Sequence, residues 1–390
     1  MRIKSCTIYA LRIPFVEAFA HSAKSRKASD SIVVRLESMD GATGYGEGLA
    51  RVYVTGETVQ TSIAHIRDCL WPAVRDFDYS ELRPHPDPLH ALASVDESLP
   101  AQTSDGVIAF NAARSAIEIA LVDLLLRRQN ISLAEILPPR RTAVTYGGVI
   151  SSGSIEGSLR RAKQLKLFGV REVKIKIRNS DDIERVRAIR DVLGPAARLR
   201  VDANGAFNNR MAVEIARELA PFRIEAFEQP ISRAEGTSAL AEVREESPIP
   251  IMADESLVTA RDARSLIDAS ACDYFNLRLS KCGGIRETLR VAGLARASGV
   301  RLQLGSQVGE TAILSAAGRH VAAHLHDAEF VEGSYGKLLL AEDVSRDPVQ
   351  FGHGGRAPLL RGPGLGISVR EDVLKSYARA TIHPGEDNHA

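Results

Sequence analysis

The sequence predicts an α/β protein in which a closed barrel of parallel strands follows a smaller α+β unit. A chain of 390 residues is too long for one ordinary core. From about Ala143 onward, short apolar segments alternate with amphipathic helical segments, a pattern typical of parallel strands joined by crossover helices. Eight strand candidates occur in this region, and eight parallel strands favour a closed barrel over an open sheet.

The first third of the chain has a different pattern. Residues 1 to about 55 read as strands, with a hairpin turn near Asp40-Gly41. Residues 55–137 then show helical periodicity, clearest in FNAARSAIEIALVDLLLRR. The proline-containing stretch LPPRR at 137–141 indicates a boundary. We therefore expect residues 1–137 to form an α+β unit.

The barrel is expected over residues 138–345. About 200 residues lie between Ala143 and Asp343, fewer than the roughly 250 of a complete (β/α)₈ barrel, so one helix is expected to be short or missing. The tail, residues 346–390, contains no further βα unit and should return to the N-terminal unit. The eight strand candidates are TYGGVI, VKIKI, LRVDAN, IEAFEQP, IPIMADES, YFNLRL, RLQLGS and EFVEGS.

Charge and hydropathy exclude several classes of protein. Fifty basic residues against 49 acidic ones give a formal net charge of +1, which argues against nucleic acid as the main partner. No stretch reaches the roughly 18 apolar residues of a membrane span, and the N-terminus lacks the apolar core of a signal peptide. Four scattered cysteines without a CxxC pair suit free thiols in a reducing compartment, so we expect a cytoplasmic protein.

Two lysines stand out in the second strand candidate, VKIKI. Because side chains alternate along a strand, Lys174 and Lys176 share one face and should point into the barrel mouth. Desolvation and a like-charged neighbour both lower a lysine pKa, which is what a general base needs. The alternative is an edge strand whose lysines lie in solvent.

Three acids end consecutive strand candidates: Asp202, Glu228 and Asp254. Their spacings, 228 − 202 = 26 and 254 − 228 = 26, are about one βα unit, which places them on adjacent strands at one height. Converging carboxylates repel unless a cation lies among them, and an all-oxygen donor set indicates a hard ion such as Mg²⁺. The alternative is that each acid caps the following helix.

Lys281 follows the sixth strand candidate, 27 residues after Asp254, and is expected across the mouth from the two lysines. An ordinary surface lysine is the alternative. Further polar residues end the last two strand candidates and could line a pocket, although each also suits an ordinary loop. These residues are Ser306, Gln307, Glu310, Glu332 and Ser334.

The ordered set Lys174-x-Lys176, Asp202, Glu228, Asp254-Glu255 and Lys281 resembles the enolase superfamily, specifically its muconate-lactonizing (muconate cycloisomerase) subgroup. The stretches VTGET (54–58), AIEIALVDL (116–124), the N-x4-K-x-G-G run from Asn276 and PGLGI (363–367) are similar to landmarks of that family. The segment RLQLGSQVGET lacks the histidine that mandelate-racemase-like members carry.

The resemblance implies a (β/α)₇β modified TIM barrel with an α+β capping domain. It also implies Mg²⁺, or Mn²⁺, bound by Asp202, Glu228 and Asp254. Lys176 would be the base on one face, Lys174 would tune it or hold the substrate carboxylate, and Lys281 would act on the opposite face. The supporting or substrate-binding residues would be Asn204, Glu255, Asn276, Ser306 and Glu332.

The implied reaction is proton removal next to a carboxylate, through an enediolate. We expect an isomerase: a racemase or epimerase of an N-acyl amino acid or dipeptide, or a muconate-type cycloisomerase. A dehydratase or o-succinylbenzoate synthase-like lyase and a non-catalytic binding barrel are the alternatives. The substrate should be a small carboxylate, with neither nucleic acid nor membrane as a partner, and the protein a homo-oligomer.

Substrate specificity is less clearly marked in the sequence. The Asp-x-Asp of dipeptide epimerases is replaced by Glu332-Gly333-Ser334, and Glu332 lies about one residue out of register with the corresponding cycloisomerase glutamate. The polar, basic segment AFAHSAKSRKASD (18–30) is expected to form a capping loop that suits an anionic substrate.

Overall fold

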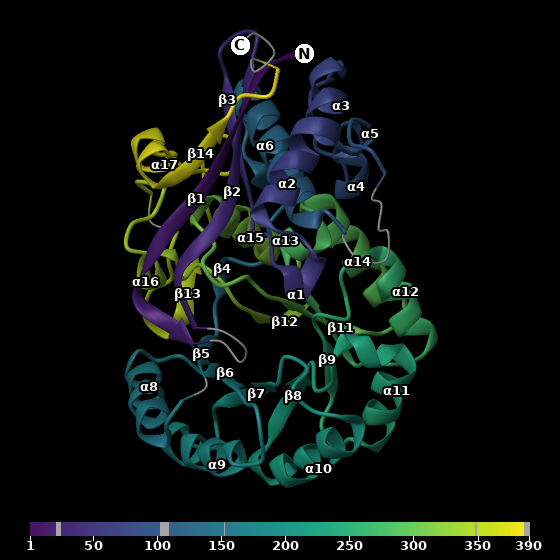
Figure 1. Cartoon of the computed structure of the whole chain (residues 1–390), viewed down its shortest axis with the longest axis vertical. Coiled ribbons are helices and arrows are strands. Elements are labelled where there is room, and N and C mark those ends of the chain that lie inside the picture. The colour runs from purple at the N-terminus through teal and green to yellow at the C-terminus, as the bar shows by residue number, and fades with distance from the viewer. Residues whose placement is uncertain (21–24, 102–108, 152, 348, 386–390) are drawn as a thin grey trace.

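The computed structural model of the chain describes residues 1–20, 25–101, 109–151, 153–347 and 349–385 (Figure 1). Part of the expected capping loop, residues 21–24, lies outside the described residues. The flanking segments belong to the two long strands of a hairpin, whose last pair is Ala20 with Ser25.

An antiparallel sheet forms the N-terminal unit, in the order β14-β1-β2-β3. The strands β2 and β3 flank the turn predicted at Asp40-Gly41, so the expected hairpin is confirmed. The C-terminal strand β14 pairs with β1, with Ile8 opposite Ile382. The bounds are β1 Ile3–Ala20, β2 Ser25–Ser38, β3 Thr43–Gly48 and β14 Ala378–Ile382.

Helices cover this sheet, with the long buried helix α6 (Asn111–Gln129) packed directly on β3. The predicted helical periodicity therefore corresponds to a real helix, which ends at Asn130 in the left-handed region (φ 55°). The other helices of this part of the chain are α1 Val52–Thr55, α2 Val59–His65, η1 Ile66–Leu70, α3 Trp71–Asp76, α4 Pro88–Ala91, α5 Ala93–Glu97 and α7 Leu133–Ile136.

Backbone contact between β3 and α6 requires glycine at alternate positions of the strand. Gly44, Gly46 and Gly48 share the face that meets the helix, and a methyl group built on Gly46 would lie 2.1 Å from the carbonyl oxygen of Ala116. The tight packing explains the G-x-G-x-G pattern of residues 44–48. It joins the hairpin to the helix that lies against the barrel.

We expect Gly46→Ala to lower the free energy of unfolding by about 1–3 kcal/mol or more, because the added methyl overpacks a backbone contact. Gly293→Ala is the matched control: its new methyl meets nothing within 4 Å on an exposed helical position, and alanine favours a helix. Urea denaturation of the three proteins measures both effects. Equal stability of Gly46→Ala and wild type would contradict the packing argument.

Eight parallel strands form the second sheet, in the order β12-β11-β10-β9-β8-β7-β6-β5. The two end strands meet through a hydrogen bond from the Gly147 N–H to the Val331 carbonyl oxygen, 2.9 Å. The bounds are β5 Gly148–Ile150, β6 Glu172–Lys176, β7 Arg198–Asp202, β8 Ile224–Glu228, β9 Ile251–Ala253, β10 Tyr274–Leu277, β11 Arg301–Leu304 and β12 Ala328–Val331.

Helices connect successive barrel strands and form the outer layer seen around the lower half of Figure 1. Within the described residues no helix of this kind leads from β12 to a ninth barrel strand, so the arrangement is (β/α)₇β and the predicted fold class is confirmed. The connecting helices are α8 Ile155–Leu167, α9 Asp182–Leu193, α10 Asn209–Leu219, α11 Gly236–Glu246, α12 Ala260–Asp268, α14 Ile285–Ala297 and α15 Ala312–His324.

The first strand candidate, TYGGVI, is divided in the structure. β4 (Ala143–Thr145) pairs with β13 (Arg356–Pro358) outside the barrel, and only β5 enters the barrel sheet. The division occurs at Tyr146, whose N–H bonds to Gly355 rather than to a barrel strand. The remaining short elements are η2 Ala220–Phe222, η3 Arg233–Glu235, α13 Leu279–Cys282, α16 Gly336–Leu339, η4 His353–Gly355 and α17 Glu371–Tyr377.

The PGLGI stretch near the C-terminus is tied to the N-terminal unit by one buried acid. Asp123 of α6 accepts hydrogen bonds from the Leu365 N–H and the Tyr45 N–H, both 2.9 Å. Gly364 has φ 66°, and a methyl group there would collide with Asp123. Asp123 thus holds the N-terminal sheet and the C-terminal segment together.

Two further findings bear on the protein class. Among the helices of the described residues, none is both long enough and apolar enough to cross a bilayer. All four cysteines lie in the described part of the chain and none of them forms a disulfide there; three of them, Cys6, Cys272 and Cys282, are buried.

Candidate active site

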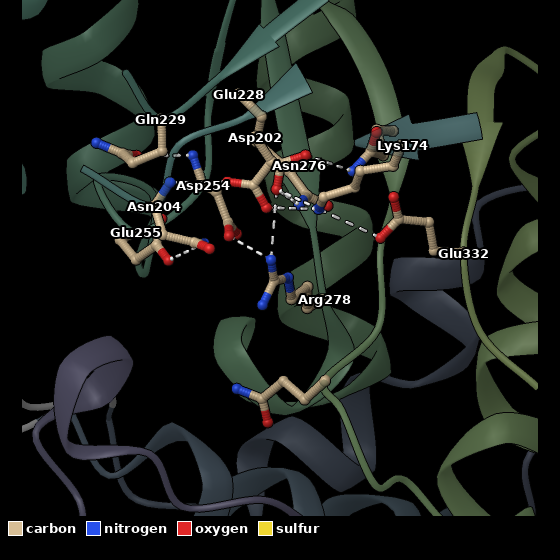
Figure 2. Close-up of polar contacts among 12 residues, drawn as sticks. Lys174, Asp202, Asn204, Glu228, Gln229, Asp254, Glu255, Asn276, Arg278 and Glu332 are labelled. Carbon is tan, nitrogen blue, oxygen red and sulfur yellow. Dashed lines mark hydrogen bonds and ion pairs between the residues drawn. The ribbon is translucent and has the colours of Figure 1, made fainter. Parts of the chain in front are cut away.

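Charged side chains from consecutive strands meet at one end of the barrel (Figure 2). Lys176 on β6 is in register with Asp202 on β7, which is in register with Glu228 on β8. Asp254 comes directly after β9. Because parallel strand ends lie at one edge of a sheet, the 26-residue spacing brings the three acids together, and all three are fully buried.

The two lysines pair with acids rather than with each other. The Lys174 Nζ lies 2.8 Å from Glu228 Oε1 and 3.0 Å from Asp202 Oδ2. The Lys176 Nζ lies 2.7 Å from Asp202 Oδ2 and 2.6 Å from Asn204 Oδ1. Both ammonium groups therefore sit on the barrel's interior face, and the edge-strand alternative is wrong.

These contacts correct one electrostatic expectation. We predicted that the neighbouring lysines lower each other's pKa. Burial does lower the pKa of Lys174, but the carboxylates of Asp202 and Glu228 outweigh burial, and the net result is a raised pKa. Likewise, burial alone would raise the pKa of Asp202, while the two lysines lower it overall. In both cases the oppositely charged partner affects the pKa more than burial does, because the two charges lie within hydrogen-bond distance.

A guanidinium that we did not predict as part of the site joins two of the acids. Arg278 follows β10, and its Nη2 contacts Asp254 Oδ2 and lies 3.5 Å from Glu228 Oε1 (Figure 2). Burial by itself lowers the pKa of Arg278, but these carboxylates raise it overall. One signal in the sequence could have revealed it: Arg278 is two residues after Asn276, so both share one face of the strand.

Amide side chains arrange the acids. Asn276 Nδ2 donates to Glu228 Oε1 at 2.9 Å, and Asn204 Nδ2 donates to Glu255 Oε1 at 3.0 Å. The side-chain Oε1 of Gln229 accepts the Asp254 backbone N–H at 3.0 Å, an orienting role that the sequence did not suggest. Burial and the nearby Asp254 charge raise the pKa of Glu255 to about 8.

The residue types in this cluster fit a magnesium ion. As placed, no three Asp, Glu, His or Cys side chains of the described residues are close enough to hold an ion. Lys174 contacts Glu228, and Arg278 contacts Asp254. Two buried oxygens, Glu255 Oε2 and Asn276 Oδ1, have no hydrogen-bond partner among the residues that the structure describes. An oxygen-only set with unsatisfied buried acceptors is the chemistry that Mg²⁺ takes.

Lys281 differs in position from the other two lysines. It lies on α13 with no exposed surface, and its Nζ donates to the Asp254 carbonyl oxygen (2.7 Å), Asp254 Oδ1 (2.8 Å) and the Asn276 carbonyl oxygen (2.7 Å). An ammonium has three N–H groups, and all three are used. Lys281 thus orients the strand end beneath the acids, and the cavity wall at this side of the mouth carries Arg278 instead.

A cavity of about 830 Å³ opens over the two lysines. Arg278, Ser306 and Glu332 line it together with Lys174 and Lys176. Glu332 also contacts Arg200 (3.0 Å) and Lys174 (3.5 Å). Apolar and α8 residues complete the wall, including Val16, Val149, Val308, Leu338, Leu339, Arg160 and Arg161.

The other predicted wall residues lie outside this cavity lining. Ser334 accepts a hydrogen bond from Arg319 at 2.9 Å, and the Gln307 N–H donates to Glu310 at 2.6 Å. Burial raises the pKa of Glu310 to about 8. Within the described residues, the buried side-chain nitrogen and oxygen of Gln307 have no hydrogen-bond partner.

The fold and the site define a class of barrel enzyme, and comparison with known proteins places the chain within it. Residues 158–373 match the enolase C-terminal domain-like family, and residues 6–138 match the mandelate racemase/muconate lactonizing enzyme N-terminal domain. The chain belongs to the enolase superfamily and is an isomerase of its mandelate racemase/muconate lactonizing group, so the resemblance in the sequence is confirmed.

Its relatives perform different isomerisations. The chain is 29% identical to the N-succinyl-L-Arg/Lys racemase of Bacillus cereus over 96% of this chain and 97% of that protein. It is 30% identical to muconate cycloisomerase 1 of Pseudomonas putida over 89% of this chain and 90% of that protein. A dipeptide epimerase from Cytophaga hutchinsonii, solved with Mg and the dipeptide D-Ala-L-Val, superposes with a TM-score of 0.85 at 27% identity, covering 98% of this chain and all of that one.

Proposed function

We propose that this isomerase is Mg²⁺-dependent and removes the proton next to a substrate carboxylate, so that the reaction passes through an enediolate. The observation that carries the proposal is the position of Lys176: its amine lies on the cavity wall, 2.7 Å from a buried acid of the neighbouring strand. A titratable amine held beside a cluster of buried carboxylates is the arrangement that proton abstraction needs.

Each residue of the site has its own proposed role in this reaction. Asp202, Glu228 and Asp254 would hold the ion, and Mg²⁺ bound there supplies Lewis-acid stabilisation of negative charge on the substrate carboxylate. Lys176, when its amine is unprotonated, accepts the α-proton. Lys174, on the same wall, donates hydrogen bonds to the substrate carboxylate. The apolar wall excludes water and strengthens these interactions.

Two kinds of isomerisation remain open for such an intermediate. Returning the proton to the other face inverts the centre, as in a racemase or epimerase of an N-acyl amino acid or dipeptide. Opening or closing a ring from the same intermediate gives a cycloisomerase. The arginines of α8 at the cavity mouth, Arg160 and Arg161, support a substrate with a second anionic or polar end.

We also propose the domain bounds, the cellular location and the oligomeric state of the enzyme. Residues 1–137 form the capping domain, residues 138–345 form the barrel, and residues 346–390 form a segment that returns to the cap. The pairing of β14 with β1 supports the last assignment. Buried cysteines outside any disulfide of the described residues support a cytoplasmic protein, and we propose a homo-oligomer.

The proposal predicts exchange of the α-proton in D₂O. Wild-type enzyme with Mg²⁺ should replace the α-¹H of at least one of three probes, N-succinyl-L-arginine, L-Ala-L-Glu and muconolactone, and ¹H NMR follows the loss of the signal. Enzyme treated with EDTA is the control and should be inactive. Absence of exchange and of ring opening with every probe would contradict the proposed function.

A further inference from the structure

The two faces of the cavity carry chemically different cations. In the order of the eight barrel strands, β10 is four positions from β6, which places the two strand ends on opposite sides of the mouth. β6 presents the amines of Lys174 and Lys176, whereas the residue that directly follows β10 and lines the cavity is Arg278. The side chain across from the proposed base is therefore a guanidinium.

A guanidinium differs from an amine in its ability to transfer a proton. Arginine retains its proton in proteins and has no acceptor atom, whereas lysine can release a proton and take it back. Arg278 is also held in place, because its Nη2 contacts Asp254 and lies 3.5 Å from Glu228. Arg278 can donate hydrogen bonds toward the cavity, but it cannot act as an acid/base.

Lys281 does not supply the acid/base group that Arg278 cannot provide on this face. Its three N–H groups are bonded to Asp254 and Asn276, and it does not line the cavity. The remaining acidic side chains on the described wall, Glu332 and Tyr335, follow β12, which is two strands from β6 and two strands from β10. Their contacts place them on the lysine side, because Glu332 lies 3.5 Å from Lys174 and the Tyr335 hydroxyl donates a hydrogen bond to the Gly147 carbonyl oxygen, next to β5. On the described cavity wall, the face opposite Lys176 thus lacks an acid/base side chain.

We propose that Arg278 determines the stereochemical outcome by confining proton transfer to the Lys176 face. This inference rests on the proposed function and narrows it. Inversion requires removal of the proton on one face and its return on the other, which takes two acid/base groups. With a single one, the isomerisation that fits is ring opening or closure.

Lys176 is the one acid/base group that the proposed ring opening needs. The Lys176 amine takes the α-proton of a lactone acid, and the electron pair of the C–H bond forms the enediolate. Its collapse forms a carbon–carbon double bond and breaks the bond to the ring oxygen, which leaves as a carboxylate. The proton stays on Lys176 as an ammonium. In the reverse direction the carboxylate adds to the double bond, and Lys176 returns the proton to the same face.

The test compares exchange with inversion in one reaction mixture. Wild-type enzyme with Mg²⁺ in D₂O is incubated with N-succinyl-L-arginine, L-Ala-L-Glu and muconolactone, followed by ¹H NMR and chiral chromatography. For the first two, exchange should be about 100-fold or more faster than inversion, because an absent general acid costs at least that factor. Muconolactone should open to the diacid. Inversion as fast as exchange would overturn the proposal.

Two variants at position 278 test whether the lack of an acid/base group there prevents inversion. Arg278→Lys supplies an amine to the second face, and the ratio of exchange to inversion should fall by about tenfold or more. Arg278→Met removes the charge without supplying an acid/base, and inversion should remain absent. An unchanged ratio in Arg278→Lys that still binds Mn²⁺, checked by electron paramagnetic resonance, would overturn the proposal.

Lys281→Met is the control for a role of the buried lysine. It should lower the unfolding midpoint because three hydrogen bonds are lost, while the exchange-to-inversion ratio stays that of wild type. A changed ratio in this variant would reassign the second face to Lys281. Failure of exchange and ring opening with every probe would instead contradict the proposed function itself, and so the two failures are distinguishable.

Discussion

Replacing Lys176 by alanine is expected to reduce α-proton exchange by about three orders of magnitude or more, since the variant has no amine to take the proton. The neighbouring lysine cannot substitute, because the Lys174 Nζ is already bonded to Glu228 and Asp202. The rate of signal loss in D₂O, measured by ¹H NMR on whichever probe the wild type exchanges, reports the effect directly.

A second substitution separates acid/base chemistry from charge. Lys176→Arg keeps a cation next to Asp202 but cannot accept a proton, so it should be as inactive as Lys176→Ala. Lys163→Ala, on an exposed position of α8, is the matched control and should exchange at the wild-type rate. Substantial exchange by Lys176→Arg would show that Lys176 acts through its charge alone.

Glu228→Gln is expected to abolish metal-dependent activity, because it removes one negative charge from the centre of the acid cluster without changing the side chain's shape. Glu228 is fully buried and contacts Lys174, Asn276 and Arg278. Removing a direct ligand should weaken Mn²⁺ binding by at least the roughly 10–100-fold known for outer-shell partners. Titration with Mn²⁺, followed by electron paramagnetic resonance, measures this loss.

The same strand provides a matched control. Glu225 faces the opposite way and pairs with Arg198 at 2.7 Å near the surface, so Glu225→Gln should bind Mn²⁺ as wild type does. In the wild type, EDTA should remove exchange and added Mg²⁺ or Mn²⁺ should restore it. Circular dichroism checks that Glu228→Gln is folded, and exchange that is indifferent to chelator would refute the metal assignment.

The sequence predicted the fold through features that depend on local physics. Apolar strand segments repeating about every 26 residues, each followed by an amphipathic helix, can bury their apolar faces only as a parallel sheet covered by helices. The same spacing carries Asp202, Glu228 and Asp254 to neighbouring strand ends at one height. The N-terminal hairpin and helix α6 were readable from turn chemistry and helical periodicity for the same reason.

Other features depended on distant residues that sequence reasoning could not place. The division of TYGGVI into β4 and β5 depends on β13, about 210 residues later in the chain, because Thr145 pairs with Arg356. The raised pKa of Lys174 depends on acids contributed by β7 and β8. In each case the deciding partner comes from another element of the barrel.

The sequence by itself determined the barrel, its capping unit and the set of charges that would meet at one end of the strands, because hydrophobic periodicity and spacing are local properties. The tertiary structure alone decided which cation faces Lys176. Arg278 and Lys281 are three residues apart, and the strand ends at Leu277, so Arg278 reaches the cavity wall while Lys281 turns beneath it to bond Asp254 and Asn276. The end point of β10 follows from its pairing with β9 and β11, a long-range contact that no local pattern records.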